Sequence, residues 1–374
     1  MDTALVPFRV EVPDSELADL TRRLAATRWP DAETVDDWSQ GMPLAYAKDL
    51  AEYWANVYDW RATEAKLNAI PQFKTEIDGV GIHFLHARSP HPQAKPLLLT
   101  HGWPGSVAEF LDVIEPLTNP PDPADAFHVV APSLPGYGFS DKPTGTGWTL
   151  ERIAESFVTL MGRIGYDKFY AHGNDWGSFI TGILGHIAPD HVEAIHLVMP
   201  FAPAPEAEVQ LTQEDYKGLG ALKEFAAKES AYAAVMNTKP QSLAYGLTDS
   251  PIGQLGWAGE KYWSWSDHDG DAEKIISRDR ILDMVSVCWF TATAASSGRL
   301  YWESYNKSPL TQVGVPTGFS VFPADARMPK AWAEHRFTDL RYWREMPSGG
   351  HFPALENPVV LVEELRTFFR LVRS

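Results

Sequence analysis

Apolar and polar positions follow two different patterns along the chain. In the first part, residues 15–26 place their leucines on one helical face, and Asp14 is the expected N-cap. Residues 44–57 predict a second long helix, and a third begins at Tyr58. This part is also rich in aromatic residues, which a disordered tail lacks. We therefore expect a helical segment that wraps around a core.

From Phe73 onward, short apolar runs alternate with segments of helical periodicity. The first two runs flank an Asp-Gly pair and predict a β-hairpin. Helical patterns at residues 150–164 and 178–187 separate later runs, as in a mostly parallel, doubly wound α/β sheet. The expected strands are residues 73–77, 81–87, 97–100, 128–131, 168–172, 194–199, 315–322 and 342–346.

The alternation stops at a proline-rich stretch after residue 199, and a helical region rich in Trp and Tyr follows. A helical insert between two strands of such a sheet predicts a lid over the carboxyl ends of the strands, where α/β sheets bind ligands. The chain then divides into an N-terminal meander (1–71), a first core part (72–201), a lid (202–310) and a second core part (311–374).

Composition narrows the classes of function. A formal net charge of −17 argues against nucleic acid as a partner, because phosphates require a basic surface. Cys288 is the only cysteine, so no internal disulfide and no cysteine-based zinc site can form, and its apolar surroundings indicate a buried, inert thiol. No ligand-spaced metal cluster and no membrane-spanning stretch is visible. We expect a cytoplasmic protein that needs no cofactor.

The segment from Gly173 to Gly177 has the G-x-S-x-G spacing of a nucleophile elbow, with Asp175 in the place of the serine. Taken alone, this pattern fits an ordinary acidic loop residue equally well. Its position between a predicted strand and a predicted helix favours the elbow. A carboxylate can attack a saturated carbon and form an ester that water reopens, whereas a serine would form a stable ether. The elbow therefore predicts cleavage of a carbon–oxygen or carbon–halogen bond.

Two further residues complete a triad in the expected chain order. His351 follows the last predicted strand between glycines and is the candidate general base. Asp325 ends the preceding strand and is assigned to orient the imidazole, with Glu303 as the competing acid. The segment from His101 to Ser106 follows another strand, so the backbone amide of Trp103, with that of Trp176, predicts an oxyanion hole.

These motifs resemble the microsomal-type epoxide hydrolases, which combine the α/β-hydrolase fold with an N-terminal meander domain. The resemblance covers nearly the whole chain. It is carried by Thr27-Arg28-Trp29-Pro30, Trp38-Ser39-Gln40-Gly41, His101-Gly102-Trp103-Pro104-Gly105-Ser106, Asp175-Trp176-Gly177, Val315-Pro316-Thr317-Gly318 and Gly349-Gly350-His351-Phe352.

The resemblance implies that an epoxide is opened to a vicinal diol through an ester on Asp175. It also implies two lid tyrosines, matched here by Tyr232 and Tyr301, as proton donors to the epoxide oxygen. The acid of this family is often glutamate, and Asp325 is one methylene shorter. Animal members carry an N-terminal membrane anchor that this chain lacks, so we expect no membrane attachment.

Two alternatives remain open at this point. A haloalkane dehalogenase uses the same aspartate elbow but has no need of two phenol donors. A non-catalytic hydrolase-like binding protein would be expected to lose a triad residue, and all three are present. The lid aromatics Trp257, Tyr262, Trp263 and Trp265 suit a bulky epoxide, although lid core is the slightly favoured interpretation. The particular epoxide, a detoxifying or biosynthetic role, and the oligomeric state, a homodimer included, are left open.

Overall fold

The computed structural model describes residues 4–205, 209–305, 307 and 311–373, and within them nine strands form one sheet in the order β1-β2-β3-β5-β4-β6-β7-β8-β9. The strands β4 to β9 pair in parallel, and β1, β2 and β3 form the antiparallel edge, which joins β5. The mostly parallel sheet is therefore confirmed. The strands are β1 Val6–Pro7, β2 Gln72–Ile77, β3 Val80–Ala87, β4 Lys95–Thr100, β5 Phe127–Pro132, β6 Phe169–Gly173, β7 Val192–Leu197, β8 Thr317–Val321 and β9 Leu340–Glu345.

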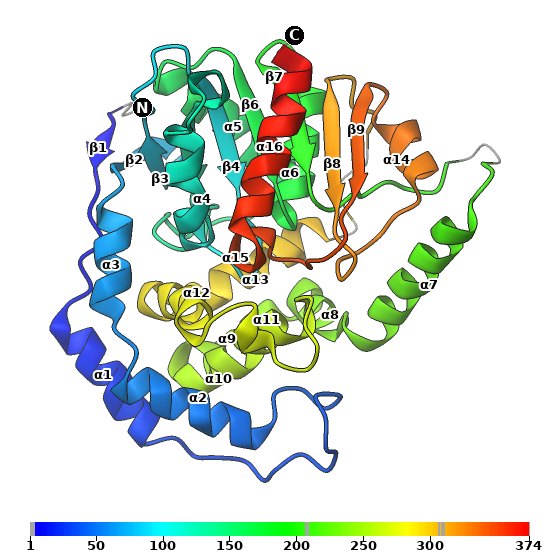
Figure 1. The fold of residues 1–374 in the computed structure, drawn as a ribbon. Helices are drawn as coiled ribbons and strands as arrows, with labels where there is room; N and C mark the ends of the chain where they lie inside the picture. The colour runs from blue at the N-terminus through cyan, green and yellow to red at the C-terminus, as the bar shows by residue number, and fades with distance from the viewer. Residues whose placement is uncertain (1–3, 206–208, 306, 308–310, 374) are drawn as a thin grey trace.

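Helices cover both faces of the sheet, as doubly wound topology requires. In Figure 1, α4 and α16 lie in front of the sheet, and α5 and α6 lie behind it. The core helices are α4 Leu111–Thr118, α5 Leu150–Arg163, α6 Trp176–Ile187, α14 Lys330–Arg336, α15 Pro353–Glu356 and α16 Pro358–Arg373.

The N-terminal segment forms three helices: α1 Asp14–Ala25, α2 Leu44–Asn56 and α3 Trp60–Asn68. Asp14 was predicted to be the N-cap of α1, but it is the first residue of the helix. Pro13 takes the N-cap position, with φ −59° and ψ 145°. The Asp14 carboxylate instead pairs with Arg61 of α3. It still lies in the first turn, where the helix dipole favours a negative charge.

The meander leaves the sheet at β1, passes beneath the lid and returns through α3 to β2 (Figure 1). It is fastened to the lid by specific contacts. The Trp54 indole N–H donates to Ser286 Oγ at 3.0 Å, and the Tyr58 hydroxyl donates to Asp283 Oδ1 at 2.9 Å. Trp38 stacks on Trp263 with ring centroids 4.3 Å apart. These contacts hold the N-terminal segment against the lid.

The lid helices lie between β7 and β8 in the sequence and below the carboxyl ends of the parallel strands in Figure 1. They are α7 Gln213–Lys228, α8 Ala231–Thr238, α9 Pro240–Asp249, α10 Pro251–Gln254, α11 Glu260–Ser264, α12 Arg278–Thr291 and α13 Ala294–Ser304. The division of the chain at residues 71, 201 and 310 stays a proposal, and residue 310 lies outside the described residues.

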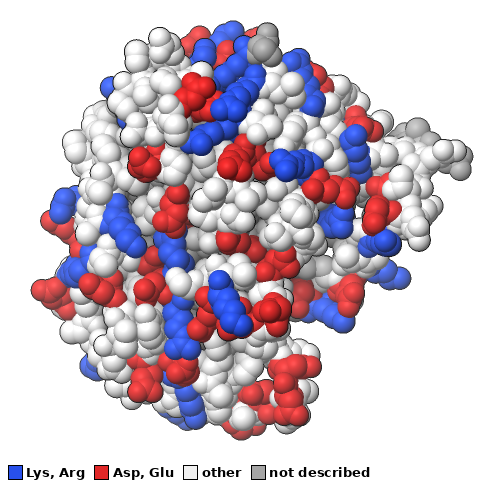
Figure 2. Space-filling model, viewed as in Figure 1, with Lys and Arg blue, Asp and Glu red and all other residues white. Residues whose placement is uncertain are grey.

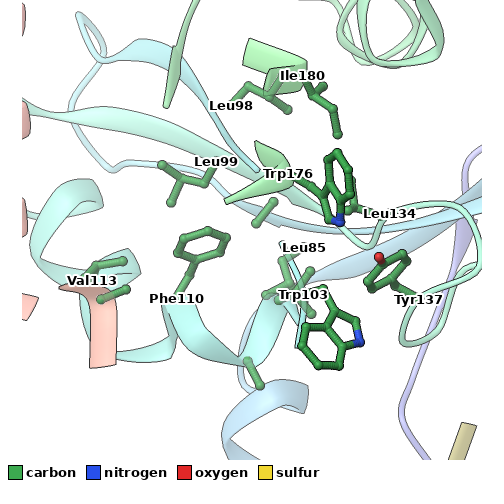
Figure 3. Packing of buried hydrophobic residues seen from close by; sticks show 14 of the residues in the cluster. Leu85, Leu98, Leu99, Trp103, Phe110, Val113, Leu134, Tyr137, Trp176 and Ile180 are labelled. Carbon is green, nitrogen blue, oxygen red and sulfur yellow. The ribbon is translucent and has the colours of Figure 1, made fainter. Parts of the chain in front are cut away.

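Buried apolar side chains surround the elbow. Figure 3 shows Leu99, Phe110 and Leu134 packed near Trp103 and Trp176, and all five are at most 5 % exposed. Each large side chain removed from water contributes about 2–3 kcal/mol to folding before its entropy cost. This packing holds the turns that follow β4 and β6 in fixed positions.

Charged side chains of both signs are interspersed over most of the face shown in Figure 2. Cys288 is half-buried rather than fully buried as expected, and desolvation raises the pKa of its thiol to about 11, so that it stays protonated at neutral pH. Among the helices of the described residues, none is both long and apolar enough to cross a membrane.

Candidate active site

Asp175 occupies the turn between β6 and α6 with φ 49° and ψ −127°, a backbone region that costs a non-glycine residue strain. The turn is tight because the helix backbone nearly touches β4. A Cβ atom on Gly177 would lie 1.9 Å from the carbonyl oxygen of Thr100, so only glycine fits there. The strand–turn–helix context of the predicted elbow is therefore present.

One oxygen of the Asp175 carboxylate is held by the loop after β4. The Trp103 amide N–H donates to Asp175 Oδ1 at 2.7 Å. A Cβ atom on Gly102 would lie 2.1 Å from the same oxygen, so this approach also requires glycine. Trp176 follows Asp175 directly as the first residue of α6, and its amide as a second donor stays a prediction.

His351 lies between the two aspartates. Its Nε2 is 3.4 Å from Asp175 Oδ2, and its Nδ1 is 2.8 Å from Asp325 Oδ1. Asp325 Oδ1 also accepts the Ala326 N–H at 2.7 Å. Glu303 instead accepts the Gly147 N–H at 3.0 Å and does not contact the imidazole. The structure therefore brings Asp325, and not Glu303, to His351.

The electrostatics of His351 are set by these neighbours. Burial lowers the pKa of the imidazole, but the charge of Asp325, with hydrogen bonds and charge from Asp175, outweighs burial and holds the pKa well above its ordinary value. At neutral pH the imidazole therefore carries a proton. The lid also fixes its backbone, because the His351 N–H donates to the Trp265 carbonyl at 2.9 Å.

Tyr232 in α8 and Tyr301 in α13 meet on the lid side, with ring centroids 5.8 Å apart. Trp103 stacks on Tyr232 at 5.0 Å, and Trp176 packs its ring against Tyr301 at 4.8 Å. Burial raises the pKa of both phenols well above 10, and the charge of Asp175 raises it further. Both tyrosines therefore stay protonated at neutral pH and remain hydrogen-bond donors.

These groups share one cavity of about 190 Å³. Apart from the polar groups already described, its wall is mainly aromatic and aliphatic. Of the lid aromatics considered above, Trp265 lines the cavity, whereas Tyr262 is fully buried and its hydroxyl donates to the Pro104 carbonyl at 3.1 Å. The lining residues are Leu150, Asp175, Trp176, Phe179, Met199, Phe201, Leu222, Phe225, Tyr232, Trp265, Tyr301, Ser304, Tyr305, Asp325, Ala326 and His351.

Two buried residues near the active site, one acidic and one basic, were not predicted from the sequence. Glu109 is 3 % exposed, and burial raises the pKa of its carboxyl to about 8, with a further contribution from the charge of Asp175. Its place three residues after Ser106 looks like an ordinary helix start. Lys261 is 8 % exposed in α11, and nothing in Glu260-Lys261-Tyr262 distinguishes it from a surface lysine. Among the described residues, no group of three or more His, Cys, Asp or Glu could hold a metal ion.

Family models match two overlapping parts of the chain. Residues 5–110 match the model "Epoxide hydrolase N terminus", and residues 95–244 match the model of the α/β-hydrolase fold. A protein of Stigmatella aurantiaca that bears the provisional name epoxide hydrolase is 48 % identical over 99 % of this chain and 86 % of its own. Epoxide hydrolase 1 of Sus scrofa is 33 % identical over 100 % and 90 %.

Solved structures of epoxide hydrolases are also similar to this chain. Aspergillus niger epoxide hydrolase is similar with a TM-score of 0.89 and 33 % identity, covering 99 % of this chain and 97 % of its own. Juvenile hormone epoxide hydrolase of Bombyx mori has a TM-score of 0.92, 28 % identity and coverage of 100 % and 95 %. Fold and elbow thus define an α/β hydrolase. Within that class, the chain belongs to the epoxide hydrolase family and is an enzyme of that kind.

Proposed function

We propose that this epoxide hydrolase opens its substrate through a covalent ester on Asp175 and then hydrolyses the ester with water activated by His351. The observation that carries the proposal is the contact set of Asp175, with one carboxylate oxygen on the Trp103 amide and the other 3.4 Å from His351 Nε2. A base so close to a fixed carboxylate suits attack of water on an ester at that position.

In the first step, Asp175 Oδ2 attacks an epoxide carbon, because Oδ1 is engaged by the Trp103 amide. The new ester bond forms as the carbon–oxygen bond of the ring breaks. The departing oxygen is a poor leaving group, so it takes one proton from Tyr232 or Tyr301 while the other phenol donates a hydrogen bond to it. Both phenols are protonated, and both line the same cavity as Asp175.

The proton lost by that tyrosine is restored from His351, which starts the cycle protonated. Ester formation removes the negative charge of Asp175, one of the groups that hold the pKa of His351 high. The pKa of the imidazole therefore falls after the first step. His351 becomes neutral when a general base is needed.

In the second step, neutral His351 takes a proton from water, and the hydroxide adds to the ester carbon of Asp175. The amide of Trp103, with Trp176 as the predicted second donor, stabilises the oxyanion on Oδ1. Collapse expels the diol oxygen, which takes the proton from His351. The Asp175 carboxyl then returns a proton to His351, so that the resting charges are restored. Asp325 orients the imidazole and balances its charge throughout.

The substrate that this cavity suits is a neutral epoxide with an apolar or aromatic substituent. Its lining is largely Phe, Trp, Leu and Met, which suits an apolar substituent. Water is the second reactant. A haloalkane is the competing substrate, and the two phenols argue against it because a halide leaves without a proton.

The proposal is tested by trapping the ester. We expect His351→Gln to accumulate an adduct of protein plus styrene oxide in intact mass spectra, because alkylation proceeds and hydrolysis does not. His191→Gln, which changes an exposed histidine, is the matched control and should show no adduct at steady state. A His351→Gln protein that turns over styrene oxide without an adduct would show direct hydration. Release of halide from 1-chlorobutane faster than diol formation from any epoxide would favour the dehalogenase.

A further inference from the structure

Lys261 places a buried ammonium group against the aromatic wall of the active site. Its Nζ lies 5.2 Å from the ring centroid of Tyr232 and 5.4 Å from that of Trp265. Only 8 % of the residue is exposed. Burial of a charged lysine costs hydration energy, and lysine is rarely buried unless it is paired. We therefore ask what this lysine contributes to the two aromatic rings that line the cavity.

Carboxylates hold this ammonium in place. Nζ lies 2.7 Å from Glu260 Oε2 and 3.2 Å from Glu229 Oε2. Glu229 is the C-cap of α7 and stands three residues before Tyr232, so the ion pair joins α11 to the start of α8. Lys261 is thus tied to the backbone segment that carries Tyr232 as well as to its ring.

A cation over a phenol ring acts differently before and during ring opening. As Tyr232 gives its proton to the epoxide oxygen, its ring gains the negative charge of a phenolate. A nearby ammonium attracts that charge more strongly than it attracts the neutral ring. An interaction that strengthens in the transition state accelerates the step. Among the described residues, no Lys or Arg lies over the ring of Tyr301.

We infer that Lys261 is a positioning residue for ring opening, which favours proton donation from the Tyr232 hydroxyl through the charge over its ring. This inference rests on the proposed role of Tyr232. It makes the two tyrosines unequal, with Tyr232 as the stronger donor. It also limits the effect of Lys261 to alkylation and leaves hydrolysis of the ester to His351.

The test is a double-mutant cycle between Lys261→Met and Tyr232→Phe, with alkylation followed by stopped-flow tryptophan fluorescence under single turnover with styrene oxide. Methionine keeps the apolar stem and removes the charge. We expect Lys261→Met to slow alkylation about fivefold and Lys261→Arg to restore most of the rate. In the Tyr232→Phe background, the same change should alter alkylation less than about twofold. Lys48→Met, which removes an ammonium from the ring of Trp29 in the meander, is the matched control.

Glu229→Gln separates charge from tethering. If the ammonium acts through its charge, loss of one offsetting carboxylate leaves alkylation at or above the wild-type rate; slower alkylation would overturn the inference. It would also be overturned if Lys261→Met slowed alkylation equally with and without the Tyr232 hydroxyl, or did not slow it. Wild-type alkylation by Tyr232→Phe itself would instead overturn the proposed role of Tyr232. Circular dichroism of each variant confirms folding.

Discussion

The two walls of the cavity differ in how they are built and in which charges they carry. The sheet wall presents Asp175, Asp325 and His351 from turns after the ends of strands, and the imidazole of His351 carries a proton. The lid wall presents Tyr232 and Tyr301 from helices, and these phenols stay neutral. On the proposed scheme, bond making to carbon belongs to the sheet wall, whereas proton supply to the leaving oxygen belongs to the lid wall.

The largest effect should follow from removing the nucleophile on the sheet wall. We expect Asp175→Ala to abolish diol formation, because neither the lid tyrosines nor His351 can form the ester. The measurement is diol formation from styrene oxide by chromatography, with circular dichroism as the check on folding. Retention of a substantial part of the wild-type rate would move bond making away from the sheet wall.

A substitution of Asp325, on the same wall, should have a smaller effect on activity than loss of the nucleophile. We expect Asp325→Asn to lower kcat by about a thousandfold or more, because a neutral amide neither fixes the tautomer of His351 nor stabilises its charged form. Glu303→Gln is the matched control and should change kcat less than about threefold, since Glu303 contacts the Gly147 amide and not the imidazole. The opposite ranking in two folded variants would transfer the acid role to Glu303.

The lid wall should show intermediate effects confined to ring opening. We expect Tyr232→Phe and Tyr301→Phe each to slow alkylation by about tenfold to a hundredfold, since one donor remains, and the double variant nearly to eliminate it. Hydrolysis of the ester, followed after rapid mixing, should change little. A double variant that alkylates at the wild-type rate would remove the lid wall from proton supply altogether.

The last prediction concerns the stability of the protein rather than its activity, and it is made at Glu109, a buried carboxyl near Asp175. The pKa of Glu109 is raised to about 8 from 4.5, so the folded protein keeps a proton that the unfolded chain releases above pH 4.5. The free energy of unfolding therefore falls as pH rises from 4.5 to 8 and is no longer altered by this group above that range. Glu109→Gln does not titrate, so we expect it to be more stable than wild type by about 3–5 kcal/mol at pH 8.5.

The comparison that checks this is urea unfolding at pH 5 and pH 8.5. The advantage of Glu109→Gln should be small at pH 5 and largest at pH 8.5. Glu115→Gln, which changes an exposed carboxyl in the following helix, should show no such growth. A difference between Glu109→Gln and wild type that is equal at the two pH values would mean that Glu109 is ionised in the folded protein throughout.

The difference between the walls also explains what sequence could predict. Strand-end positions follow from local alternation and glycine spacing, so Asp175, Asp325 and His351 could be assigned from short patterns in the chain. The lid tyrosines came only from resemblance, because helical periodicity does not say which aromatic residue faces a cavity. Lys261 depends on contacts between α7, α8 and α11, which no short pattern encodes. The N-cap assignment of Asp14 was wrong because the preceding proline already sets the start of the helix.

The hydrogen bond from the Trp103 amide to Asp175 Oδ1 has a consequence for isotope labelling. On the proposed scheme, Oδ1 stays in place through both steps, while the other oxygen leaves inside the diol and is replaced by one from water. In ¹⁸O-labelled water, the first diol from each molecule should then carry an unlabelled oxygen from the enzyme, and later diols should carry label. The aspartate itself should retain one labelled oxygen and never two. Each solvent oxygen that enters the Asp175 carboxylate in one turnover would thus leave in the diol of the next turnover.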